Sequence, residues 1–97
     1  MPEPPPASDT GLEPYLGREI VIDTDSSFVI IGKLIAIGPD YLTLEAVDVH
    51  DGKDAKSTRD HYVMETGKLG TRSNRRGTKV RVAHIVSVSL LDDIETW

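Results

Sequence analysis

The apolar residues of this chain gather in short runs with the length and spacing of β-strands. The runs lie at residues 19–24, 28–37, 41–49 and, in two parts, 79–90. Turn-forming residues at 25–27 and 38–40 separate the first three runs and predict an antiparallel meander. In the last run Val86, Val88 and Leu90 alternate with serines, which is typical of a strand with one buried face. The pattern predicts a small all-β domain.

The run over residues 28–37 is apolar on both of its faces, unlike a strand with one side in water. Something must cover its second face, and we expect another subunit to supply part of that cover. Gly32 lies inside the run and predicts a bend or a close approach of another backbone. A strongly curved strand in a small barrel needs such a position.

The remaining segments are polar or rich in proline. The predicted organisation is a disordered Pro-rich tail at 1–10, one domain at 11–92 and a C-terminal tail at 93–97. The domain starts with a short helix that ends before Gly17, a residue suited to a left-handed cap. Residues 50–78 are expected to form a long charged loop or an extended hairpin, in which only residues 62–64 resemble a strand.

Composition narrows the class of protein. The 97 residues include 9 Val, 8 Ile and 8 Leu but only 5% aromatic residues, which favours strands over a helical bundle. The absence of cysteine excludes disulfide frameworks, thiolate zinc sites and cysteine nucleophiles. No apolar run approaches the roughly 20 residues of a membrane helix, and the N-terminus lacks a signal-peptide pattern. We expect a cytoplasmic protein that has no membrane partner.

Charge is distributed unevenly along the chain. The net charge is −5, but residues 1–66 carry 5 basic and 13 acidic side chains, whereas residues 67–91 carry 6 basic side chains and no acidic one. The six are Lys68, Arg72, Arg75, Arg76, Lys79 and Arg81. Closely spaced cations of this kind suit phosphate binding. The alternative is a solvated segment that balances the acidic body.

Two segments resemble the motifs of the Sm-like family. Residues 32–34, a turn and residues 41–44 resemble the first Sm motif, in which G-x-L precedes a turn and N-L-x-L. Residues 80–88 resemble the second motif, which has an aliphatic residue, Arg-Gly and aliphatic residues three apart. Residues 12–16 fit the helix that caps the barrel. The resemblance implies an all-β fold, a small five-stranded, strongly bent antiparallel Sm-like (SH3-like) open barrel with a short N-terminal helix.

Together with the basic segment, the resemblance leads us to expect a bacterial-type Sm-like protein. It implies a homo-oligomeric ring, a hexamer or heptamer, that binds single-stranded RNA weakly through the arginine of the second motif and the basic loop. The implied RNA-binding residues are Arg81, Tyr41, Asp40, Lys68, Arg72, Arg75, Arg76 and Lys79. However, Tyr41 replaces the base-binding Asn of the family, and Val82 replaces the Gly after the arginine. The alternative is therefore a ring-forming structural or protein-interaction module that has lost RNA binding.

The sequence gives less support for metal binding or catalysis than for RNA binding. The residues considered for a divalent metal are Asp48, His50, Asp51, Asp60 and His61. Their spacing matches no known signature, and ordinary polar loop residues are the alternative. His84 is expected to be a hydrogen-bonded turn residue. Because no G-x-S-x-G, H-E-x-x-H or phosphate-loop motif is present, we predict a protein that is not an enzyme and holds no cofactor.

Overall fold

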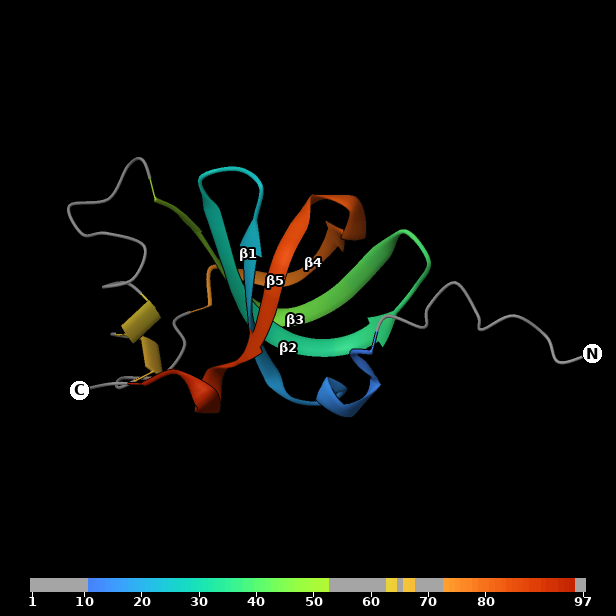
Figure 1. Ribbon diagram of the computed structural model, residues 1–97, viewed down its shortest axis with the longest axis horizontal. Coiled ribbons are helices and arrows are strands. Elements are labelled where there is room, and N and C mark those ends of the chain that lie inside the picture. The colour runs from blue at the N-terminus through green and yellow to red at the C-terminus, as the bar shows by residue number, and fades with distance from the viewer. Residues whose placement is uncertain (1–10, 53–62, 65, 68–72, 96–97) are drawn as a thin grey trace, which may run out of the picture.

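The computed structural model describes residues 11–52, 63–64, 66–67 and 73–95. Five strands form one antiparallel sheet in the order β4-β3-β2-β1-β5, which bends into an open barrel (Figure 1). The strands are β1 (Glu19–Thr24), β2 (Phe28–Ile37), β3 (Tyr41–Asp51), β4 (Arg75–Arg81) and β5 (Ile85–Leu90). Three short 3-10 helices are η1 (Glu13–Tyr15), η2 (Val82–His84) and η3 (Leu91–Asp93). The predicted class, a bent five-stranded all-β barrel, is confirmed.

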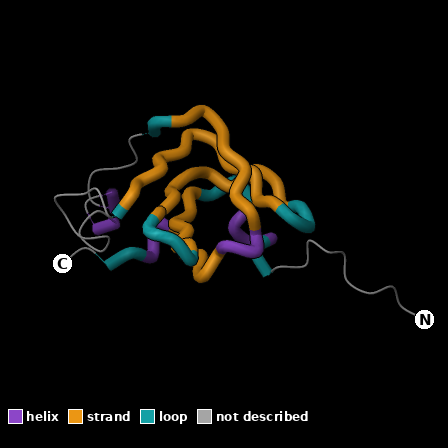
Figure 2. The backbone as a smooth tube through the Cα atoms, turned by 90° about the horizontal axis from the view of Figure 1, so that it is seen from above, coloured by secondary structure: helices purple, strands orange, loops and turns teal. Residues whose placement is uncertain are grey.

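The strand boundaries follow the predicted runs closely in the first half of the sheet. β1 and β2 begin and end where the sequence predicts, and the turns at 25–27 and 38–40 produce the expected meander. β3 continues beyond its predicted end at residue 49 to Asp51. The two parts predicted over 79–90 are β4 and β5, which η2 joins, and β4 begins four residues earlier than predicted. Figure 2, seen from above, shows the strands curving round a common interior.

The inside of the barrel holds the larger of two apolar clusters. Its buried members come from all five strands and are Ile20, Ile22, Ile30, Leu34, Leu42, Leu44, Val47, Val80 and Leu90. Leu12 and Tyr15 pack against this cluster from the segment that carries η1. Gly17 follows at φ +81°, the left-handed conformation expected of it, and its N–H donates to the Leu34 carbonyl at 2.7 Å. The predicted N-terminal cap is therefore present as a three-residue helix.

A second apolar cluster lies on the opposite face of β1 and β2. Its members are Val21, Val29, Ile31 and Leu91, with Val63 and Ile94 packed on them. Successive strand residues point to opposite faces, so this cluster and the barrel interior share the same two strands. The second face of β2 is thus covered from within the chain. Ile35, farther along β2, stays 44% exposed, and the expectation that another subunit supplies part of the cover stays a prediction.

The segment that covers the outer cluster is helical where the structure describes it, at residues 63–64 and 66–67. The prediction that residues 62–64 resemble a strand is therefore wrong for Val63 and Met64. Val63 packs on the outer cluster, and Thr66, three residues later, is buried. Residues three apart share a face of a helix, so contact with the sheet outweighs the strand propensity of valine.

Several expectations fall outside the described residues. These are the tail at 1–10, Tyr62, and the last two residues of the tail at 93–97. In the described part of the chain, no helix combines the length and the apolar character that a membrane span requires. The connection predicted at 50–78 has different limits, because β3 reaches Asp51 and β4 already begins at Arg75.

Asn74 extends the pairing of β3 beyond the start of β4 through its side chain. The amide oxygen of Asn74 accepts from the Val49 N–H, and its amide nitrogen donates to the Val49 carbonyl, both at 3.1 Å. The same nitrogen donates to the Asp48 carboxylate at 3.0 Å. One amide side chain thus satisfies backbone groups of β3 that an edge would otherwise leave to water.

Ala46 occupies an irregularity in the pairing of β2 with β3. Ile31 pairs with Asp48 and Lys33 pairs with Glu45, so Gly32 lies opposite both Ala46 and Val47. An extra residue on one strand is a β-bulge, which bends the strand and increases its twist. Ala46 has φ +50°, the left-handed region that costs an L-residue with a side chain about 1 kcal/mol.

Replacing Ala46 by glycine is expected to raise the free energy of unfolding by about 0.5 kcal/mol. The strain of the left-handed backbone is relieved, and the greater entropy of glycine in the unfolded chain offsets part of the gain. Urea unfolding of Ala46→Gly checks the sign. Ala36→Gly, at an exposed position of β2, is the matched control and should lower the free energy of unfolding by about 0.5 to 1 kcal/mol. If both variants lowered the free energy of unfolding equally, the backbone at Ala46 would not be strained.

Candidate functional site

Tyr41 and Arg81 form a pair at one end of the barrel. Tyr41 is the first residue of β3, Arg81 is the last residue of β4, and the two are register partners. The Nη2 of Arg81 donates to the Tyr41 hydroxyl at 3.0 Å, and its guanidinium carbon lies 5.5 Å from the centroid of the Tyr41 ring. This contact holds the guanidinium of Arg81 at the rim of the barrel.

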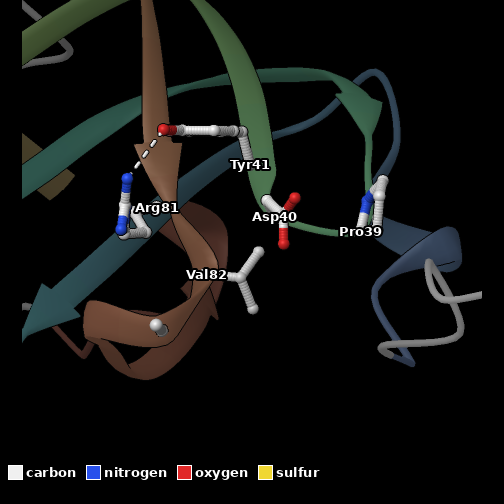
Figure 3. Close-up of a pocket in the computed structure, with 6 residues that line it drawn as sticks. Pro39, Asp40, Tyr41, Arg81 and Val82 are labelled. Carbon is white, nitrogen blue, oxygen red and sulfur yellow. Dashed lines mark hydrogen bonds between the residues drawn. The ribbon is translucent and has the colours of Figure 1, made fainter.

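A shallow pocket of about 470 Å³ surrounds this pair (Figure 3). Its lining residues are Pro39, Asp40, Tyr41, Arg81, Val82 and Ala83. The Val82 N–H donates to the Asp40 carbonyl at 2.8 Å, which ties η2 to the turn between β2 and β3. The pocket therefore presents one guanidinium, one phenol and one carboxylate where the start of β3 and the end of β4 meet.

A second, more apolar depression of about 410 Å³, which Arg81 also lines, lies between β4 and the turn that joins β1 to β2. We call it the β4 groove; it is lined by Thr24, Asp25, Ser26, Phe28, Ile30, Lys79, Val80, Arg81 and His84. Phe28, Ile30 and Val80 form its apolar part. Ile30 and Val80 belong to the core, whereas Phe28 remains 41% exposed.

Two turns close one side of the β4 groove. The Nδ1 of His84 lies 3.0 Å from the Asp25 carboxylate, and the Asp25 N–H donates to the His84 carbonyl at 2.9 Å. The Thr24 hydroxyl donates to the Phe28 carbonyl at 2.8 Å and braces the turn that carries Phe28. His84 is thus the hydrogen-bonded turn residue that the sequence predicts, and it joins η2 to the β1–β2 turn.

The two outer strands of the sheet differ in charge. β4 carries Arg75, Arg76, Lys79 and Arg81 and no acidic residue. Within the described ranges, no carboxylate lies at ion-pair distance from any of these four side chains. β5 has no charged residue, and its Val86 is 68% exposed. Edge strands normally carry charges that discourage pairing with other chains, so an uncharged edge is unusual.

The structure brings together some of the residues predicted to bind RNA. Arg81, Tyr41 and Asp40 line one pocket, and Lys79 lies on β4 with its Nζ 3.5 Å from the Thr43 hydroxyl. Arg75 and Arg76 begin the same strand, which pairs with β3, so they follow the extended-hairpin alternative and not the loop. Val80 anchors this strand in the core. Lys68 and Arg72 lie outside the described residues.

The carboxylates considered for a metal site have other partners. Asp48 accepts from Asn74, and Asp51 accepts from the Ser27 hydroxyl at 2.6 Å. Asp60 and His61 lie outside the described residues. Among the residues that the structure does describe, no three His, Asp or Glu side chains gather in a metal-binding group.

Sequence reasoning missed the β4 groove. Phe28 starts a continuous apolar run, which predicts a core position for it along with the rest of that strand. The exposed position of Phe28 is set by the turn at 25–27 and by the bending of the sheet, which brings β4 and η2 near it. The chain's lone phenylalanine directly after a polar turn was the available signal.

Comparison with known proteins supports the fold. No family model matches the chain, and a search of curated proteins finds no match. Among solved structures, a chain in a crystal structure of the NatC complex bound to CoA is 14% identical, with a TM-score of 0.55 over 84% of each chain. A chain in a crystal structure of the NatC complex bound to Gag peptide and CoA is 15% identical, with a TM-score of 0.54 over 81% of this chain and 89% of that one.

These similar structures correct the function predicted from the sequence. Both similar chains are parts of the NatC complex, which contradicts the predicted homo-oligomeric ring that binds single-stranded RNA. At these identities the matches establish the fold alone, and the resemblance to the Sm-like family stays a prediction.

Proposed function

We propose that this chain is a non-catalytic, Sm-like subunit of a heteromeric protein complex, and that it joins its partner by strand addition at β5. The observation that carries this proposal is the chemistry of that edge. β5 lies at the end of the sheet order, it is uncharged, and Val86 on it is 68% exposed. A partner strand can add main-chain hydrogen bonds along such an edge and cover the exposed valine.

The architecture supports a scaffolding role over a catalytic one. The pockets at the barrel end are shallow, and the imidazole of His84 and the carboxylate of Asp25 pair with each other. Similar chains occur in a multi-chain assembly, which fits a small subunit whose main task is to bind another protein. We place this role in the cytoplasm, in keeping with a chain that contains no cysteine.

Val86→Lys tests the proposal. A lysine at this exposed edge position is expected to leave folding unchanged and to reduce recovery of the partner by about tenfold, because central apolar contacts dominate such interfaces. The tagged chain is purified from the cells that naturally produce it, and the measurement is the recovery of a second protein with it in a fixed stoichiometry. Light scattering of the isolated chain accompanies it and should show a monomer.

Ile35→Lys is the matched control. Ile35 is a similarly apolar residue, 44% exposed, but it lies on β2, which has neighbours on both sides in the sheet. We expect this variant to retain the partner. The proposal would be overturned if Val86→Lys recovered as much of the partner as the unmodified chain does. It would also be overturned if the isolated chain formed a closed homo-oligomer in solution.

A further inference from the structure

The β4 groove combines an apolar floor with an excess of positive charge. Phe28, Ile30 and Val80 supply the apolar surface, and Lys79 and Arg81 flank Val80 on β4. Alternation along the strand places the two cations on one face and Val80 on the other. The groove therefore offers an apolar position bordered by two cationic side chains.

The one carboxylate that lines the β4 groove has a partner. Asp25 contacts His84 through its side chain at 3.0 Å and through its backbone N–H. Lys79 and Arg81 have no carboxylate at ion-pair distance within the described residues. The local charge is thus available to a ligand, even though the whole chain has a net charge of −5.

In the described part of the chain, one backbone edge of β4 beside the groove has no strand partner. β4 pairs with β3 on one side, and it ends the sheet order on the other. The unpaired edge of a strand presents N–H and C=O groups to a segment in extended conformation. Arg75 and Arg76 continue the positive charge along the same strand beyond the groove.

From these features we propose that the β4 groove binds an extended acidic segment of a partner protein. One large apolar side chain of that segment enters between Phe28 and Val80, and its Asp or Glu neighbours contact Lys79 and Arg81. Its backbone follows the free edge of β4. Charge complementarity selects this occupant, because a basic or neutral segment would leave the cations without partners. This surface is separate from the β5 edge, since no residue of β5 lines the groove.

A displayed library of random segments of about twelve residues, twice the length of a typical strand, tests this proposal with the full chain as the target. We expect enriched segments to carry one large apolar residue flanked by Asp or Glu. Failure to enrich any segment, or enrichment without acidic residues, would overturn the proposal. A single-stranded RNA oligonucleotide serves as competitor, and displacement of the acidic segment by it at equal concentration would also count against the proposal.

Variants then locate the binding site of an enriched segment. Lys79→Glu combined with Arg81→Glu is expected to weaken binding at least about tenfold, and Phe28→Ala severalfold. Arg18→Glu combined with Lys33→Glu changes the net charge equally at positions away from the groove and should retain most of the binding. If both double variants lose binding to the same extent, the groove is not the site.

The β5 variant separates this inference from the proposed function. Val86→Lys is expected to bind the acidic segment like the unmodified chain, although it loses the partner of the β5 edge. If Val86→Lys no longer binds the acidic segment, the segment binds at β5, and the proposal that it binds in the β4 groove is overturned. Circular dichroism of every variant confirms folding before its binding is scored.

Discussion

Ile31→Ala is expected to lower the free energy of unfolding of the isolated chain by about 2 to 5 kcal/mol. Ile31 is fully buried on the outer face of β2, where Val63, Leu91 and Ile94 belong to the same cluster. Removing its side chain beyond Cβ leaves a cavity that this cover fills only in part. Urea unfolding at several protein concentrations measures the loss, which should not depend on concentration.

Ile35→Ala is the control for this experiment. Ile35 lies on the same strand but is 44% exposed, so its replacement should change the free energy of unfolding by less than about 1 kcal/mol. If a second subunit covered the outer face instead, Ile31→Ala would be as mild as Ile35→Ala in the dilute chain. That result would show that the cover does not come from the chain itself.

Gly32→Val is expected to lower the free energy of unfolding by about 1 to 3 kcal/mol or to prevent folding. A Cβ atom at Gly32 would lie 3.0 Å from a methyl group of Val47 and 3.2 Å from the Glu45 carbonyl oxygen. The methyl group can shift, but the carbonyl belongs to the bulge in β3 and cannot move without disturbing the sheet. Urea or thermal unfolding measures the effect.

Gly77→Val is the matched control for Gly32→Val. A Cβ atom at Gly77 of β4 would lie 3.5 Å from the Leu44 carbonyl oxygen, an ordinary van der Waals distance. Valine also suits a strand and restricts the unfolded chain, so this variant should be as stable as the original or slightly more stable. Equal stability of the two valine variants would mean that the approach at Gly32 is not tight.

Local sequence was sufficient for the first three strands. The turns at 25–27 and 38–40 separate dense apolar runs, and β1 and β2 therefore have the boundaries that the pattern predicts. The close approach at Gly32 was also predictable, because a glycine inside a curved strand commonly marks a bend or a place where another backbone comes near. Each of these features depends on residues close together along the chain.

The start of β4 could not be predicted from the local sequence pattern. Residues 75–78 read Arg-Arg-Gly-Thr, which contains no apolar residue and resembles a loop. Their strand conformation comes from backbone pairing with β3, where Arg75 lies opposite Val47 and Thr78 opposite Leu44. Pairing partners about 30 residues apart contribute hydrogen bonds whatever the side chains are, so no local pattern marks such a strand.

One candidate site could be predicted from the sequence, whereas the other depends on the tertiary structure. Arg81 and Tyr41 were chosen from motif positions, and the structure places them in one pocket with Asp40. The β4 groove is assembled from three separated stretches of the chain, around Thr24 to Ile30, around Lys79 to Arg81, and at His84. Only the bending of the sheet brings these stretches to one place.

By itself, the sequence determined an all-β chain with its first strands, its turns and the uneven distribution of its charge. The tertiary structure alone decided that Val63, Leu91 and Ile94 pack on the outer face of β2, and that the sheet ends in an uncharged strand, β5, on one side and a basic strand, β4, on the other. The physical reason is the range of the interactions. Turns and strand periodicity arise from near neighbours, whereas burial and edge exposure depend on which distant segments the bent sheet brings together.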